Sequence, residues 1–90
     1  MAIVCKRVLY SGSIQGVGFR YTARSIAAGY AVSGYVRNLA DGRVELIGEG
    51  MAAELRAFLD AIRDRWTDFI TDTVETDAAP QRLAGFTIRH

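Results

Sequence analysis

Apolar residues recur at helical spacing in two segments of this chain, with strand-like segments before, between and after them. The second helical segment is the clearer, and its stripe comprises Leu55, Phe58, Leu59, Ile62 and Trp66. Charged residues occupy the rest of its surface, which is typical of a helix with one face on a core. The stripe of the first segment comprises Phe19, Ala23, Ile26, Ala27 and Tyr30. Gly29 is predicted to cap this first helix, because glycine adopts the left-handed conformation at low cost.

Five segments have strand character, at residues 3–12, 33–40, 43–50, 69–77 and 85–90. They are rich in β-branched and aromatic residues or alternate between apolar and polar positions. Asp41 and Gly42 separate the second segment from the third, and an Asp-Gly pair between two strands predicts a hairpin. Residues 78–84 are predicted to be a connection and contain the only proline. In the last strand, Phe86 and Ile88 are expected on one face.

The order of these segments predicts a βαββαβ chain with a short extra C-terminal strand. This split βαβ order is typical of a mainly antiparallel sheet. Because crossover connections are right-handed, both helices are expected on the same face of that sheet. The expected fold class is therefore an α/β (α+β) two-layer sandwich.

Length and composition limit the classes of function. Ninety residues, 50% of them apolar, predict one ordered domain over residues 1–90. A formal net charge of +1 gives no indication of a nucleic-acid partner or a membrane surface. The chain has no run of about 18 apolar residues, and its first ten residues lack the apolar core of a signal peptide. We expect a soluble cytoplasmic monomer whose single cysteine, Cys5, fits a reducing compartment.

A glycine-rich loop, GSIQGVGFR at residues 12–20, joins the first strand to the first helix. Amides at a helix N-terminus lack intrahelical partners, and the helix dipole favours an anion there. Gly16 and Gly18 allow successive amides to turn around an anion, and the fork of Arg20 can grip two phosphate oxygens. The loop therefore predicts a cradle for a phosphoryl group. The alternative is a tight turn that merely needs glycine.

The residue types missing from this loop narrow its chemistry. It does not end in the Gly-Lys-Ser/Thr of nucleotide triphosphatases. Ile14 stands six residues before Arg20, where a phosphocysteine enzyme has its nucleophile. Cys5 is expected to pack within a strand, and His90, the only histidine, to be a solvated chain end. Metal-ligand spacing of cysteine and histidine is also absent.

An enzyme without a general acid needs a leaving group that departs unprotonated, and a carboxylate is such a group. The substrate class that suits this loop is therefore a carboxyl-phosphate mixed anhydride, attacked by water without a metal or cofactor.

Two stretches of the chain resemble the signatures of the acylphosphatase family: residues 12–20 and GYVRNLADGRVELIGEG at residues 34–50. The closing GFTIRH resembles the family's C-terminal strand, so the resemblance covers nearly all of the chain. It implies a ferredoxin-like sandwich, in agreement with the order of elements, and hydrolysis of acyl phosphates without metal or cofactor. The departures from the family pattern are Ser13, Ile14, His90 and the loosely matching segment from Thr67 to Ala84.

Residue by residue, the resemblance implies that Arg20 binds the phosphate and that Asn38 orients the attacking water. It also implies a phosphate cradle of backbone amides from Gln15, Gly16, Val17, Gly18 and Phe19. From its own context Asn38 is ambiguous, because asparagine at the end of a strand is also a common turn residue.

Other functions are compatible with the same order of elements. One is a ferredoxin-like binding or accessory module for carbamoyl phosphate or another phosphorylated ligand, without turnover. An RNA-recognition module would need aromatic residues on its third strand, and residues 43–49 contain none. A metal-carrying ferredoxin-like domain would need paired cysteines in the loop.

Overall fold

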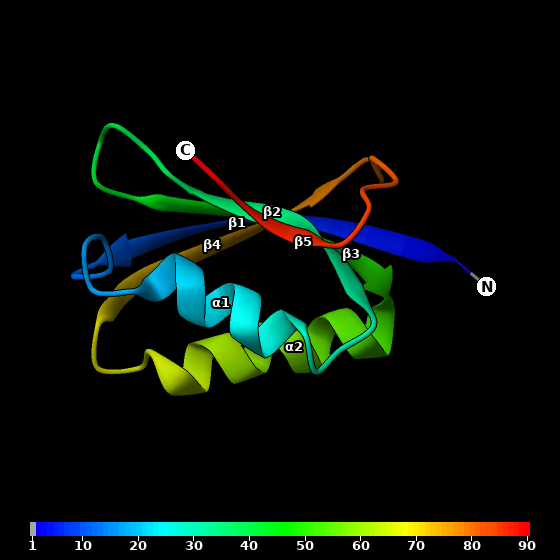
Figure 1. Ribbon diagram of the computed structural model, residues 1–90, viewed down its shortest axis with the longest axis horizontal. Coiled ribbons are helices and arrows are strands. Elements are labelled where there is room, and N and C mark those ends of the chain that lie inside the picture. The colour runs from blue at the N-terminus through cyan, green and yellow to red at the C-terminus, as the bar shows by residue number, and fades with distance from the viewer. Residues whose placement is uncertain (1) are drawn as a thin grey trace.

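A computed structural model describes residues 2–90 and shows one sheet with two helices (Figure 1). The elements are β1 (Ile3–Gly12), α1 (Phe19–Ala27), β2 (Val32–Asn38), β3 (Val44–Met51), α2 (Ala52–Arg65), β4 (Ile70–Ala78) and β5 (Phe86–Arg89). The strand order across the sheet is β4-β1-β3-β2-β5. This is the βαββαβ order with the extra C-terminal strand, so the predicted ferredoxin-like α+β fold is confirmed.

Strand pairing brings three chain segments to one end of the sheet. All neighbouring strands are antiparallel except β2 and β5, which are parallel. Val44, at the start of β3, pairs with Tyr10 near the end of β1 and with Asn38 at the end of β2. The parallel pairing of Arg37 with Arg89 adds the end of β5. Figure 1 shows the loop after β1, the β2–β3 turn and the C-terminus at this same end.

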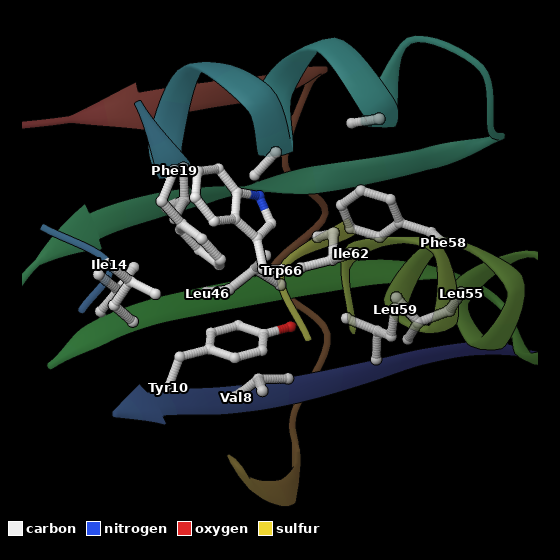
Figure 2. Packing of buried hydrophobic residues seen from close by; sticks show 14 residues of the cluster. Val8, Tyr10, Ile14, Phe19, Leu46, Leu55, Phe58, Leu59, Ile62 and Trp66 are labelled. Atoms are coloured by element: carbon white, nitrogen blue, oxygen red, sulfur yellow. The ribbon is translucent and has the colours of Figure 1, made fainter. Parts of the chain in front are cut away.

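Both helices lie on one face of the sheet (Figure 1), and the main core fills the space between the helices and the sheet. The stripe predicted for the second helix is confirmed, because Leu55, Phe58, Leu59, Ile62 and Trp66 are all buried. Figure 2 shows these side chains packed against Val8 and Tyr10 of β1 and Leu46 of β3. No helix within residues 2–90 is long and apolar enough to cross a membrane.

The predicted end of the first helix is wrong. Helix α1 ends at Ala27, and its C-cap is Ala28 in a right-handed conformation. Gly29 has no positive φ; instead its N–H donates to the Ile26 carbonyl at 3.0 Å. This tight hydrogen bond satisfies a carbonyl of the last turn without a left-handed residue. Tyr30 lies beyond the helix, where its ring still packs against the core.

The face of the sheet opposite the helices contains two buried carboxylates. Glu45 and Glu49 of β3 are only 3% and 2% exposed. Glu45 accepts hydrogen bonds from Arg7 and Arg37, each at 2.7 Å. Burial raises the pKa of Glu45, but these hydrogen bonds outweigh that effect and leave the pKa below its ordinary value. Cys5, predicted to be a strand residue, is buried on the same face.

Glu49 anchors the connection that precedes β5. Its carboxylate accepts the backbone N–H groups of Gln81, Arg82 at 3.2 Å and Leu83 at 2.8 Å. Burial raises the pKa of Glu49, but the backbone hydrogen bonds together lower it by more. The pKa of Glu49 therefore lies below its ordinary value. The carboxylate therefore fixes the path by which the chain enters the edge strand.

Candidate active site

The loop between β1 and α1 is held at both ends by buried apolar side chains. Ile14 and Phe19 are 1% and 2% exposed. The ring of Phe19 packs against Tyr10 and Trp66, with centroid separations of 5.1 and 5.3 Å (Figure 2). Residues 15–18 lie between these anchors and are exposed. The core therefore fixes the two ends of a short arch whose backbone faces solvent.

Two glycines set the backbone conformation of this arch. Gly16 and Gly18 have φ values of 77° and 86°, and Gly18 is also the N-cap of α1. A Cβ built on either glycine meets no atom within 4 Å, so backbone conformation rather than lack of space requires glycine here.

The amides of the arch are available to a ligand. Among backbone hydrogen bonds outside helices and strands in residues 2–90, none is donated by residues 15 to 19. Unpaired amides at left-handed positions before a helix N-terminus form a concave anion site. The arch therefore has the geometry that an anion cradle requires, and phosphate binding there stays a prediction.

Arg20 lies in the first turn of α1, and the end of the chain borders its side chain. Its Nη1 donates to the Arg89 carbonyl at 3.3 Å and lies 3.3 Å from Nδ1 of His90. His90 is exposed, as predicted, but its contact with Arg20 was not foreseen. The two residues are 70 positions apart, so no local sequence pattern indicates the contact.

Asn38 comes from a different element and lines one pocket together with Arg20 and the arch. It is the last residue of β2 and is exposed. The pocket has a volume of about 210 Å³, and its lining comprises Ile14, Gly16, Gly18, Phe19, Arg20, Tyr21 and Asn38. The structure thus brings together the arginine, both glycines and the asparagine singled out in the sequence. Sequence reasoning missed Tyr21, whose only signal is its position directly after Arg20.

The remaining predicted residues do not line the pocket. Val17 is 49% exposed at the top of the arch. Gln15 directs its side-chain amide to the β2–β3 turn, where its Nε2 donates to the carbonyls of Leu39 and Arg43 at 2.9 Å each. If Gln15 and Val17 contact a ligand in this pocket, they do so through their backbone amides.

A larger pocket lies at the other end of the sheet. It has a volume of about 840 Å³ and is lined partly by Ile3, Tyr30 and Leu83. Its carboxylate, Glu49, already accepts three backbone amides. None of the predicted site residues lines it, so the smaller pocket is the better candidate. Residues 2–90 contain no group of three or more His, Cys, Asp or Glu that could hold a metal ion.

The fold and this pocket define a ferredoxin-like α+β protein whose first strand–helix loop borders a small pocket. Residues 6–88 match the family model of acylphosphatase. The chain is 38% identical to the acylphosphatase of Pseudomonas paraeruginosa, in an alignment that covers 99% of each chain. It is also 38% identical to the acylphosphatase of Bacillus velezensis, over 88% of this chain and 87% of the relative.

Solved structures agree with these relatives. The crystal structure of acylphosphatase from Bacillus subtilis has a TM-score of 0.86 and 30% identity, covering 97% of this chain and 99% of that one. Full-length HypF has a TM-score of 0.87 at 22% identity; the match covers 99% of this chain and 12% of HypF, and shows the fold alone. The chain belongs to the acylphosphatase family and is an enzyme of that class.

Proposed function

We propose that the protein hydrolyses the carboxyl-phosphate anhydride of acyl phosphates to a carboxylate and inorganic phosphate. Arg20 and the loop amides bind the phosphoryl group, and Asn38 orients the attacking water. The observation that carries this proposal is the single pocket shared by Arg20, Gly16, Gly18 and Asn38. Residues 1–90 act in this reaction as one domain.

The pocket suits a phosphoryl group better than a whole organic substrate. Its volume of about 210 Å³ is below the roughly 300–1,000 Å³ of sites that enclose larger ligands. The phosphoryl oxygens receive hydrogen bonds from the free amides and from Arg20, which are strong because the acceptor is charged. These donors are fixed before the reaction, so they stabilise the charge on the phosphoryl oxygens in the transition state. The acyl part extends outside.

Asn38 supplies the second function, placement of water. A carboxamide both accepts and donates hydrogen bonds, so it can hold a water molecule with a lone pair directed at phosphorus. The bond from the water oxygen to phosphorus forms while the bond from phosphorus to the carboxylate oxygen breaks. No carboxylate or histidine lines the pocket, so the water proton passes to an oxygen of the bound phosphate. The carboxylate leaves unprotonated.

The two side chains are expected to fail differently when replaced. Arg20→Gln removes a contact to phosphate in both ground and transition states, so both hydrolysis of benzoyl phosphate and competitive inhibition by inorganic phosphate should be lost. Arg20→Lys retains the charge without the fork and should restore only part of each. Asn38→Ala should keep phosphate inhibition near the parent value while turnover falls about a hundredfold or more.

Each variant is first shown to be folded by circular dichroism and a cooperative melt, and all assays contain a metal chelator. A folded Asn38→Ala protein with parental turnover would mean that Asn38 is only a turn residue. A parent protein that binds phosphate without hydrolysing any acyl phosphate would support the binding module instead.

A further inference from the structure

The side chain of Gln15 connects the two halves of the candidate site. Its Nε2 lies 2.9 Å from the Leu39 carbonyl and 2.9 Å from the Arg43 carbonyl. Only the NH2 group of a carboxamide can face two carbonyl oxygens, because its two hydrogens supply one bond to each. The loop before α1 is therefore joined by a side chain to the turn between β2 and β3.

The turn that receives these bonds is also braced from within. The Leu39 N–H donates to the Arg43 carbonyl at 2.8 Å, and the Gly42 N–H donates to the Leu39 carbonyl at 3.2 Å. Asp41 accepts the Arg43 N–H at 3.0 Å and its Nε at 2.9 Å. Gln15 thus contacts a turn that holds its own shape, so its two hydrogen bonds fix where that turn lies relative to the loop.

We infer that Gln15 is a positioning residue that sets the separation between the phosphate cradle and Asn38. Leu39 directly follows Asn38, so a hydrogen bond to the Leu39 carbonyl holds the residue next to the proposed water-binding one. The backbone of Gln15 belongs to the cradle itself. This inference rests on the proposed roles of Arg20 and Asn38.

The expected effect is larger on rate than on stability. Gln15 is exposed, and the buried side chains of Ile14 and Phe19 anchor the loop without it. Loss of its hydrogen bonds should therefore lower the melting temperature by less than about 8 °C. A misplacement of about 1 Å between reacting groups, by contrast, can lower a rate by about a hundredfold.

The test replaces Gln15 by methionine, which has a similar length and no donor, and separately by alanine. Both Gln15→Met and Gln15→Ala should lower turnover of benzoyl phosphate about tenfold to a hundredfold. Competitive inhibition by inorganic phosphate should stay within about threefold of the parent, because the amides and Arg20 remain. Gln81→Met is the matched control, since Gln81 is an exposed glutamine of the 79–85 connection, at the other end of the sheet.

A double-mutant cycle shows whether Gln15 acts through Asn38. In an Asn38→Ala background, Gln15→Met should cost little further rate, because the water is no longer held. A full additive loss, a folded Gln15→Met protein with parental turnover, or equal loss of turnover and phosphate inhibition would each overturn the inference. Failure of the proposed function is distinct, because the parent would then lack turnover of acyl phosphate, or Arg20→Gln and Asn38→Ala would themselves keep parental turnover.

Discussion

At the level of single residues, the residues that line the candidate site were predicted better than their side-chain contacts. Gly16, Gly18 and Arg20 were singled out from their types and spacing, and Asn38 only from the resemblance to the acylphosphatase signatures. All four line one pocket. The side-chain contacts of Gln15 and His90 were not predictable, because each joins residues far apart along the chain. Which distant carbonyl a glutamine meets depends on strand register, and register is known only once the sheet has formed.

A valine at Gly18 should damage both the fold and the cradle. The left-handed φ of 86° is unfavourable for a β-branched residue, so Gly18→Val should cost about 1–3 kcal/mol of stability. A distorted arch misaligns its amides, and inhibition by phosphate should weaken about tenfold, which is about 1.4 kcal/mol. Thermal melts and inhibition assays measure the two effects separately.

Gly85→Val is the control for this change. Gly85 also has a left-handed φ, of 68°, with open space around it, but it precedes β5 and does not line the pocket. It should lose stability without losing phosphate affinity. Equal loss of phosphate affinity in both variants would show that Gly18 acts only through overall stability.

Helices and strands were predicted well where apolar residues recur regularly. They were predicted less well where hydrogen bonds determine where an element ends or which side chain is buried. The stripe of α2 was correct because its apolar spacing is regular. The end of α1 was wrong because carbonyls can be satisfied by tight hydrogen bonds as well as by a left-handed glycine. In β3, alternation did not reveal that Glu45 is buried, because its partners Arg7 and Arg37 belong to the two neighbouring strands.

The Glu45 ion pairs should make stability depend on pH. Hydrogen bonding holds the pKa of Glu45 below its ordinary value despite burial. A lowered carboxylate pKa contributes stability above the unfolded pKa, about 4.3, and this contribution is lost as pH falls through the folded pKa. Glu45→Gln should melt below the parent at pH 7, and the difference should shrink as pH falls below the unfolded pKa and through the folded one.

Melts of the two proteins across this pH range measure that difference directly. Other carboxylates are common to both proteins, so their titration largely cancels. A difference that stays constant down to the lowest pH would contradict the assigned role of the Glu45 charge.

At the scale of the whole molecule, the order of segments specified the layers and the number of strands. It did not specify that β5 would pair in parallel with β2, which places the chain end beside Arg20. That pairing depends on the connection held by Glu49, and a carboxylate bound to three backbone amides leaves no signature in local composition.

The protein is expected to be monomeric. Strand β4 is an edge of the sheet, and most of its residues are exposed. Asp72, Glu75 and Asp77 lie along it, and charged side chains on an edge strand hinder pairing with a second copy. Sedimentation velocity over a dilution series should give one species of monomer mass. A sedimentation coefficient that rises with concentration would contradict this expectation.

The single tryptophan gives the molecule an internal optical reporter. Trp66 is 3% exposed, its Nε1–H has no hydrogen-bond partner among residues 2–90, and its ring packs 5.3 Å from Phe19 and 5.2 Å from Phe69. Burial shields the indole from bulk water, so we expect its emission at short wavelength. Because Phe19 ends the glycine-rich loop, the emission spectrum of the unlabelled protein reports on the packing beneath that loop, and exposure of the indole shifts the emission to the red.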